Sequence, residues 1–528
     1  MSRTNAIFWP TSHRFMFFPF SSPSRTIALG AVLLSLFSGP LHAQAPYPET
    51  AATEQLTQTI ADTLETPTFK GAYWGIHIVN LRSGTVLYSK NANRNFVPAS
   101  NVKLFTTAAG LEQLGPEYRY RTRVYADGPV ENGTLKGNLI VRGSGDPTLG
   151  GYEQREDPTK IFRQWADSLK AEGITHITGN VVGDDSKIDE TPLGHGWSWS
   201  DITYAYAAEI GGLVFNENTI TLRLRGGEIG EPAEVTWEPF ETDYVTVVNR
   251  SRTVPYRKKE DEEYQRLMGT NTIHVTTRVH PNDWEKEAIT ISNPTRYFTH
   301  VLRQVLLREG ISVAGHPSDL DNTALDPRYD APSVRRVASY KSPPLSEIAR
   351  TLNHESRNLY AEQLLRTLAA EVPPETPDDL DPASSALGVK AVRETLGRAN
   401  VDTSRIQLVD GSGLSRQNLI QPRAVVQLLQ HMWLHSNADV SSAFYDSLPK
   451  GGQEGTLQYR FQGRAPAKAN VRAKTGTLSN TSSLSGYVTS QEGTPIAFSV
   501  FCNHHLADGD QARSAQDVVV NALARLPL

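Results

Sequence analysis

The hydrophobic pattern begins with two β-rich runs and a helix. Residues 72–80 are rich in β-branched and aromatic side chains, residues 81–84 have the composition of a turn, and residues 85–89 form a second β-rich run. This order predicts a β-hairpin. Pro98 then opens a predicted helix, which ends at Gly115-Pro116 because glycine and proline commonly follow a helix.

From about Tyr118 the pattern changes to short alternating strands between Gly- and Pro-rich turns, with one helix at about 160–171. The predicted strands lie at 120–125, 135–141, 176–182 and 218–224. A further β-rich piece follows at about 231–290, with strands at 244–248 and 272–276. The charged run 257–263 is predicted to be a solvated loop.

A helical pattern resumes around Arg335. Ser342-Pro343-Pro344 resembles a capped helix start, and Leu345, Ile348 and Leu352 then recur at helical spacing. A second, leucine-rich helix follows over 359–368. The remaining predicted elements are a strand containing Lys474, strands at 483–488 and 495–501, and a final helix at about 508–524.

These patterns predict an α/β (α+β) fold in which both ends of the chain build one domain. That domain would comprise residues 44–117 and 335–528, and residues 118–334 would form a β-rich insertion of two subdomains, the second at about 231–290. The length of 528 residues agrees with this organisation, since it exceeds one ordinary domain.

The N-terminus has the composition of a secretory signal peptide over residues 1–43. Three arginines precede the apolar run 27–37, and helix-breaking Gly39-Pro40 and small Ala43 follow it. The run is too short to span a bilayer as a helix, although an uncleaved anchor is the alternative. We therefore expect cleavage near Ala43–Gln44 and export to the periplasm or the extracellular side of the cell envelope, without a stable membrane anchor.

The composition argues against several kinds of function and site. The net charge is −5 and no basic stripe is present, so nucleic-acid binding is not predicted. The single cysteine, Cys502, excludes an internal disulfide and any multi-cysteine metal site, and we expect it to be a small buried hydrophobic residue.

The first candidate chemical motif is Ser100-Asn-Val-Lys103 at the start of a predicted helix. A spacing of three places both side chains on one face, where the amine can act on the hydroxyl. Free lysine titrates near ~10.4 and would be charged at neutral pH. Burial or a second cation, for which Lys474 is a candidate, would have to lower the pKa of Lys103.

Two further motifs complete an acyl-transfer set without histidine. Ser356-Arg-Asn358 precedes the leucine-rich helix, where the Ser356 hydroxyl can relay a proton and the Asn358 amide can bond both Lys103 and a substrate. Lys474-Thr475-Gly476-Thr477 is expected on a strand edge, with the cation and hydroxyl binding a carboxylate and Gly476 allowing close backbone approach. The backbone N–H groups of Ser100 and Thr477 are the expected oxyanion hole.

Each motif has a simpler explanation when it is taken alone. Ser356 could cap a helix, and Lys-Thr-Gly could be an ordinary strand end. Ser447-Leu-Pro-Lys450 copies the first spacing, but Pro449 prevents a helix there. Ser89-Lys-Asn91 copies the second motif but lies upstream of Ser100. The order of all three motifs on suitable elements favours the chemical interpretation.

Ser-x-x-Lys, Ser-x-Asn and Lys-Thr-Gly resemble the signature of β-lactamases and penicillin-binding proteins. About 250 residues separate the first two motifs, and this long separation resembles class C low-molecular-mass penicillin-binding proteins of the penicillin-binding protein four type. Further patterns are similar to this family, among them Asp410-Gly-Ser-Gly413, which we expect near the cleft. Arg357 departs from the family, where Asp is common, but its side chain is not expected to do chemistry.

The resemblance implies a serine β-lactamase/transpeptidase-like domain with D-Ala-D-Ala carboxypeptidase and/or D,D-endopeptidase activity on peptidoglycan stem peptides and cross-links. Ser100, Lys103, Ser356 and Asn358 would be catalytic, and Lys474, Thr475, Gly476 and Thr477 would bind substrate. The resemblance implies neither cofactor nor metal, and β-lactams would act as covalent inhibitors. A β-lactamase or esterase on the same fold and a penicillin-binding sensor without turnover are the alternatives, and oligomeric state is not predicted.

Overall fold

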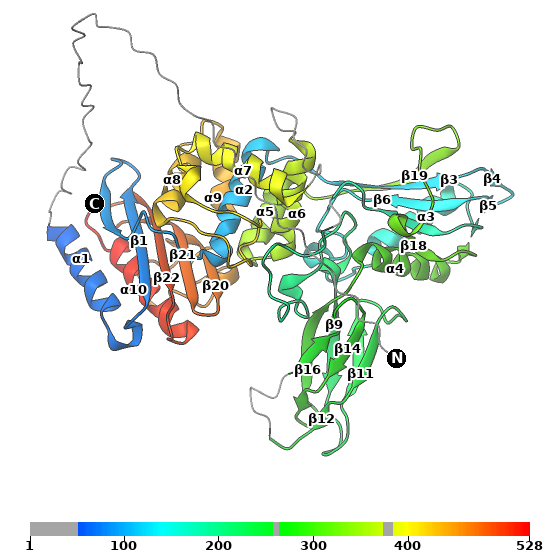
Figure 1. Ribbon diagram of the computed structural model, residues 1–528, viewed down its shortest axis with the longest axis horizontal. Helices are drawn as coiled ribbons and strands as arrows, with labels where there is room; N and C mark the ends of the chain where they lie inside the picture. The colour runs from blue at the N-terminus through cyan, green and yellow to red at the C-terminus, as the bar shows by residue number, and fades with distance from the viewer. Residues whose placement is uncertain (1–50, 189–190, 257–262, 373–383) are drawn as a thin grey trace, which may run out of the picture. The chain divides into compact units, whose positions relative to one another are not determined.

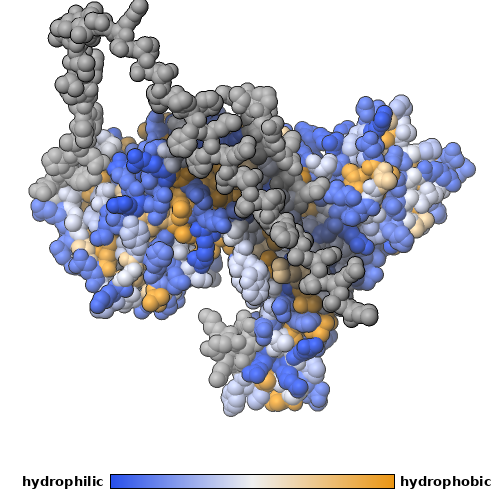
Figure 2. Space-filling view, viewed as in Figure 1, coloured by the Kyte–Doolittle hydropathy of each residue, from blue (hydrophilic) through white to orange (hydrophobic). Residues whose placement is uncertain are grey.

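The computed structural model of the chain describes residues 51–188, 191–256, 263–372 and 384–528. The predicted signal peptide and all but one residue of the charged run 257–263 lie outside these ranges. Helices and β-sheets are both prominent (Figure 1). Among the described residues, no helix is long and apolar enough to cross a membrane, and the face seen in Figure 2 carries scattered apolar residues between hydrophilic ones.

Both ends of the described chain contribute to one five-stranded antiparallel sheet with the order β2-β1-β22-β21-β20. Its strands are β1 (Tyr73–Asn80), β2 (Val86–Lys90), β20 (Arg472–Leu478), β21 (Thr481–Thr489) and β22 (Pro495–Asn503). The predicted hairpin is confirmed, since β1 pairs with β2. The other edge of β1 pairs with β22, which leaves β20, the strand of Lys474, at the edge of the sheet.

Helices cover both faces of this sheet. One face packs against α1 (Ala51–Leu64) and α10 (Gly509–Ala524), which confirms the predicted final helix. The other face packs against a larger helical layer formed by α2 (Val102–Gln113), α5 (Leu345–His354), α6 (Asn358–Glu371), α7 (Ser385–Arg398), α8 (Pro422–Trp433) and α9 (Ala438–Asp446).

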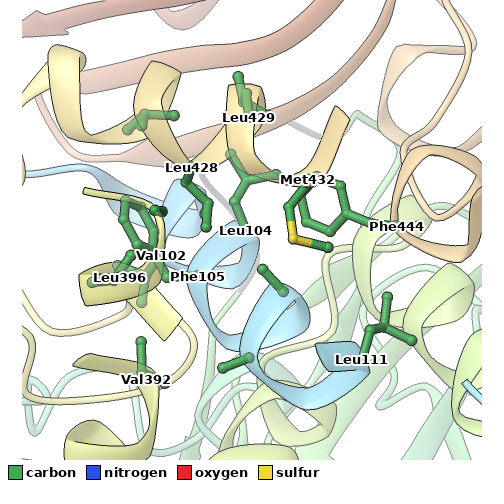
Figure 3. Packing of buried hydrophobic residues seen from close by; sticks show 14 of the residues in the cluster. Val102, Leu104, Phe105, Leu111, Val392, Leu396, Leu428, Leu429, Met432 and Phe444 are labelled. Atoms are coloured by element: carbon green, nitrogen blue, oxygen red, sulfur yellow. The ribbon is translucent and has the colours of Figure 1, made fainter. Parts of the chain in front are cut away.

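Helix α2 lies in the middle of the helical layer. Figure 3 shows Leu104 and Phe105 of α2 among Leu428 and Leu429 of α8 and Leu396 of α7. Each of these side chains is buried, and burial of such a side chain contributes about 1.5–3 kcal/mol. Packing on several sides therefore fixes the helix that begins just after Ser100.

The middle of the chain forms separate sheets around its own apolar cluster. The larger sheet has the order β18-β8-β6-β3-β19 and consists of β3 (Arg121–Asp127), β6 (Asn138–Arg142), β8 (Val181–Asp184), β18 (Pro317–Asp319) and β19 (Val334–Lys341). A four-stranded sheet contains β4 (Val130–Glu131), β5 (Thr134–Leu135), β7 (His176–Ile177) and β17 (Ser312–Val313).

Three smaller sheets lie between residues 219 and 290. They contain β9 (Thr219–Arg225), β10 (Glu234–Glu238) and β16 (Trp284–Thr290); β11 (Thr246–Asn249), β13 (Tyr264–Arg266) and β14 (Thr272–Val275); and β12 (Arg252–Thr253) with β15 (Arg278–Val279). The helices of this part are α3 (Lys160–Ala171), which was predicted, and α4 (Pro294–Arg308), which was not.

Two predicted strands of the middle region are wrong as continuous elements. Residues 135–141 divide between β5 and β6, and residues 176–182 divide between β7 and β8, so each run passes from one sheet to another. Glycines stand at both crossings: a Cβ at Gly137 would lie 1.8 Å from Asp127 O, and one at Gly179 would lie 2.5 Å from Gly137 O. Glycine permits this close backbone approach.

The prediction that helical structure resumes at Arg335 is also wrong, because the helix begins ten residues later. Residues 334–341 form β19, which pairs with β3, and α5 begins at Leu345. Ser342 does not cap α5, because its hydroxyl accepts a hydrogen bond from Tyr120 N and donates one to Pro343 O. Pairing with a strand that is distant in sequence determines the structure here, and a local pattern does not report such pairing.

Candidate active site

Ser100 lies in a 3₁₀ turn, Ala99–Asn101, that leads into α2. The prediction placed Ser100 inside the helix, whereas the first α-helical residue is Val102. Ala99 has a φ of 48°, a left-handed conformation that costs a non-glycine residue energy and persists only where packing enforces it. Despite the tighter turn, Lys103 Nζ lies 3.0 Å from Ser100 Oγ.

Lys103 is fully buried and has three oxygen neighbours. Its Nζ lies 2.6 Å from Asn358 Oδ1, 2.7 Å from Ser412 O and 3.0 Å from Ser100 Oγ. A neutral amine has two N–H donors and one lone pair. If the two shortest contacts take the donors, the lone pair faces the Ser100 hydroxyl.

Burial lowers the pKa of Lys103 from 10.5 to about 7, against the opposing charges of Asp410 and Glu362. Burial, the first of the two causes proposed from the sequence, is therefore the main one. Burial also lowers the pKa of Lys474, and the charge of Lys103 lowers it further. The pKa of Lys103 is thus close to neutral pH, so a substantial share of this amine is uncharged there.

The second motif forms the turn before α6. Ser356 has a φ of 57°, and its hydroxyl accepts a hydrogen bond from Lys474 Nζ at 2.8 Å. The N-cap of α6 is Arg357, and no side chain caps this end of the helix. Ser356 is therefore directed to Lys474, and the capping explanation does not apply.

Asn358 connects Lys103 to the middle region. Its Oδ1 accepts from Lys103 Nζ, and its Nδ2 donates to the backbone carbonyl of Tyr206 at 2.7 Å. One N–H of the amide remains for a substrate. Tyr206 was not predicted at the site, because a backbone carbonyl leaves no signal in residue identity.

Strand β20 brings the third motif against Ser100. Lys474 is buried, whereas Thr477 is exposed. A Cβ at Gly476 would lie 2.2 Å from Ser483 Oγ and 2.9 Å from Ser100 N, so only glycine allows the strand this close. The Thr475 hydroxyl donates to Thr456 Oγ1 at 3.0 Å, and Thr475 does not line the cleft.

A cleft of about 620 Å³ exposes these groups. Its lining includes Ser100, Ser356, Asn358 and Thr477 from the three motifs, together with Tyr206, Asp201, Gly413 and Arg416. Lys103 and Lys474 lie beneath this surface. All eight predicted site residues thus come from neighbouring elements, and only Thr475 points its hydroxyl elsewhere.

The loop 410–415 was predicted near the cleft, and its Gly413 lines the cleft. Two buried carboxylates anchor this loop. Asp410 accepts from the backbone N–H groups of Gly413 at 2.8 Å and Ser415 at 2.7 Å. Glu362 accepts from Gly411 N at 3.1 Å and Ser412 N at 2.8 Å. This fixes the Ser412 carbonyl that faces Lys103.

Sequence reasoning missed Glu362. The available signal was a charged pair, Glu362 and Arg366, four residues apart in a leucine-rich helix. Both side chains are buried, and Arg366 Nη1 lies 3.2 Å from Glu362 Oε2. Burial raises the pKa of Glu362, as does the nearby Asp410, whereas Arg366 opposes this rise.

Arg357 points away from the three motifs. Its guanidinium forms an ion pair with Glu217 at 3.1 Å and lies over the ring of Tyr152. Among the described residues, the two groups of carboxylate and imidazole side chains that could hold a metal ion include no residue of the three motifs.

Known proteins are similar to this chain along most of its length. The model of the D-Ala-D-Ala carboxypeptidase 3 (S13) family matches residues 56–526. The chain is 32% identical over 483 residues to a D-alanyl-D-alanine carboxypeptidase of Actinomadura sp. (strain R39), covering 89% of this chain and 84% of that protein. It is 27% identical over 491 residues to D-alanyl-D-alanine carboxypeptidase DacB of Haemophilus influenzae, covering 91% and 93%.

A similar fold is found in a solved structure. The crystal structure of penicillin binding protein 4 (dacB) from Haemophilus influenzae superimposes with a TM-score of 0.74 at 24% identity, covering 90% of this chain and 99% of that one. The same protein has been solved in complex with a β-lactam. The predicted α/β fold class and family are confirmed: the chain belongs to the D-Ala-D-Ala carboxypeptidase 3 (S13) family and is, by that membership, a serine-type D-Ala-D-Ala carboxypeptidase.

Proposed function

We propose that this carboxypeptidase acts on peptidoglycan stem peptides and cross-links through an acyl-enzyme formed on Ser100. The observation that carries the proposal is the 3.0 Å contact between Ser100 Oγ and the fully buried Lys103, whose pKa is lowered to about 7. An amine with this pKa is partly neutral at physiological pH and can accept the serine proton.

In acylation, Ser100 Oγ attacks the carbonyl carbon of the penultimate D-Ala while its proton passes to Lys103 Nζ. The backbone N–H groups of Ser100 and Thr477 stabilise the oxyanion, since Gly476 lets β20 approach Ser100. The C–N bond then breaks, and the departing amine takes up the proton that Lys103 received, relayed through the Ser356 hydroxyl, which Lys474 contacts. Water hydrolyses the resulting ester and restores Ser100.

The substrate-binding groups follow from the same arrangement. Lys474 and Thr477 would bind the terminal carboxylate, whose negative charge would favour the charged form of Lys474. Asn358 would use its remaining N–H for the peptide backbone. Thr475 can join them if its hydroxyl exchanges Thr456 for the substrate.

We also propose that β-lactams acylate Ser100, because their strained amide presents the same carbonyl next to a carboxylate. The amine of an opened β-lactam stays tethered to the acyl group, so slow hydrolysis is expected. The N-terminal composition supports export to the periplasm or the extracellular side of the envelope. The predicted insertion in the catalytic domain would extend from about residue 118 to Lys341, the end of β19, rather than to residue 334. The N-terminal sequence of the mature protein tests the export proposal.

The decisive experiment is mass spectrometry of the protein mixed with a fluorescent penicillin. We expect one stable adduct on a peptide containing Ser100, no adduct in Ser100→Ala, and an unchanged adduct in Ser89→Ala, which alters a serine outside the site. Digestion of muropeptides then measures release of D-Ala and cleavage of cross-links. Absence of an adduct with intact penicillin would overturn the proposal, and rapid hydrolysis of penicillin would indicate a β-lactamase.

A further inference from the structure

A cluster of two histidines and a glutamate lies where α2 meets the end of α8. Glu112 is in the last turn of α2, His431 is in the last turn of α8, and His435 follows that helix. One potential ligand atom from each residue lies within 4.8 Å of the other two. His431 Nε2 and Glu112 Oε2 are already 3.1 Å apart.

Neighbouring residues outside the cluster orient Glu112 and His435. Arg398 Nε donates to Glu112 Oε1, which leaves Oε2 directed at His431. His435 Nδ1 accepts a hydrogen bond from Asn437 N at 3.1 Å and lies 3.3 Å from Asn437 O. The other ring nitrogen, Nε2, then carries the proton of the neutral ring. When Nε2 binds a metal ion this proton moves to Nδ1, which would donate to the Asn437 carbonyl instead. Metal-binding histidines are commonly held in this way through their second nitrogen.

An ion pair alone explains only part of this arrangement. Contacts with Arg398 and His431 account for both oxygens of Glu112, but they give His435 no role in the cluster. His435 and His431 are four residues apart, and their rings are perpendicular with centroids 5.5 Å apart. A shared ion between the three side chains explains why all three converge.

The donor set selects the class of ion. Two imidazoles and one carboxylate form a known zinc ligand set with a fourth position open to water. Tetrahedral ligands at about 2.0–2.1 Å from zinc lie roughly 3.3 Å from each other, close to the His431–Glu112 separation. Ca²⁺ and Mg²⁺ prefer sites made of oxygen ligands. A cavity of about 550 Å³ lined by all three residues gives an ion access from solvent.

We propose that Glu112 Oε2, His431 Nε2 and a ring nitrogen of His435 bind one zinc ion or a similar divalent transition metal. No residue lining this cavity lines the cleft of Ser100, so the ion takes no part in acyl transfer. It joins the last turn of α2 to α8, extending the apolar packing of these helices seen in Figure 3. The ion therefore braces the far end of the helix that carries Lys103.

The test is zinc binding by the chelator-treated full chain, measured by calorimetry and by competition with a zinc indicator dye. We expect one zinc ion per chain, and zinc should raise the midpoint of thermal unfolding. His431→Ala and His435→Ala should each weaken binding by at least about tenfold and remove the thermal shift. His316→Ala, which alters an exposed histidine outside the cluster, should do neither.

Both histidines are only partly buried, so misfolding of the variants is a minor concern, and circular dichroism checks each variant for folding. Cobalt provides a second readout, because Co²⁺ bound tetrahedrally by these ligands has strong visible absorption, which should be lost in the same two variants. No zinc binding by the parent protein, or binding that persists unchanged in both folded variants, would overturn the proposal.

Discussion

Lys474 Nζ lies 2.8 Å from Ser356 Oγ, and this pair mirrors the contact between Lys103 and Ser100. Each buried lysine thus faces one serine hydroxyl. Ser100 follows a left-handed residue, Ala99, and Ser356 is itself left-handed. Backbone strain at Ser356 and at the residue before Ser100 is consistent with positions fixed by function and by surrounding packing.

Two substitutions separate the effect of the Ser356 hydroxyl on catalysis from the effect of its backbone strain on stability. Ser356→Gly and Ser356→Ala both remove the hydroxyl, but glycine adopts a φ of 57° without the cost of a Cβ. We expect both variants to lose about 10²- to 10⁴-fold in peptide hydrolysis. The glycine variant should unfold with a free energy about 1 kcal/mol higher than that of the alanine variant.

Muropeptide digestion and denaturant unfolding measure these two effects. Acylation by penicillin should suffer less than peptide cleavage, because the β-lactam nitrogen does not leave. Equal loss in both reactions would argue against proton delivery to the leaving amine by Ser356.

The pH dependence of acylation reports the protonation state of Lys103. Because the pKa of this amine is lowered to about 7, the acylation rate should rise with pH and level off above about 7. Stopped-flow acylation by a chromogenic penicillin measures this profile. A rise centred near the ordinary lysine pKa would contradict a neutral Lys103 in the free enzyme.

Linkage gives an independent check on the same group. The folded pKa of Lys103 is depressed, so between about pH 7 and the ordinary value of 10.5 the unfolded chain binds a proton that the folded chain lacks. Stability of the parent protein should therefore rise with pH in this window relative to Lys103→Met. The expected slope is on the order of 1 kcal/mol per pH unit. Urea unfolding of both proteins at several pH values measures it, and a flat difference would exclude the pKa shift.

Gly476 tests the approach of β20 to Ser100. In Gly476→Ala, the new Cβ would meet Ser483 Oγ and Ser100 N, so the strand must move away from the oxyanion site. We expect acylation to fall by about 10²- to 10³-fold. Gly397→Ala in α7 is the matched control, because its Cβ would meet no atom within 4 Å and its φ is not left-handed. Comparable losses in both variants would contradict a local effect at Ser100.

The sequence predicted the parts of the site that depend on local spacing and residue type. Ser100 and Lys103 meet because they are three residues apart, and the hairpin 72–89 and the helix after Ser356 follow from local patterns. The order of the three motifs also indicated which side chains would gather in the structure. These predictions agree with the structure because few long-range contacts are needed to specify the features concerned.

Other parts depend on contacts that local patterns do not encode. The Ser412 and Tyr206 carbonyls belong to the site, yet a carbonyl is common to every residue. The runs 135–141 and 176–182 look like single strands, although each changes sheets at a glycine. Residues 334–341 became a strand because β3 lies beside them, which the hydrophobic pattern did not show.

Glu362 is the strongest case of a residue outside the motifs that controls them. It accepts hydrogen bonds from the Gly411 and Ser412 backbone N–H groups and pairs with buried Arg366. The Ser412 carbonyl in turn lies 2.7 Å from Lys103 Nζ. Glu362 therefore positions the loop that orients Lys103, without touching Ser100.

In Glu362→Gln, the amide offers one acceptor oxygen in place of two, and the Arg366 guanidinium loses its ion pair with Glu362. Breaking a buried pair in this way costs about 3–5 kcal/mol, so the unfolding free energy should fall by that order. Acylation should also slow, with a changed pH midpoint, because both the loop and the charge near Lys103 change. Glu362→Gln combined with Arg366→Met removes the charge that Glu362 no longer balances, and it should recover part of the stability but not acylation. Glu347→Gln, on the exposed surface of α5, is the control and should change neither. If the double variant recovered full acylation with an unchanged pH midpoint, the role of Glu362 would be limited to neutralising Arg366.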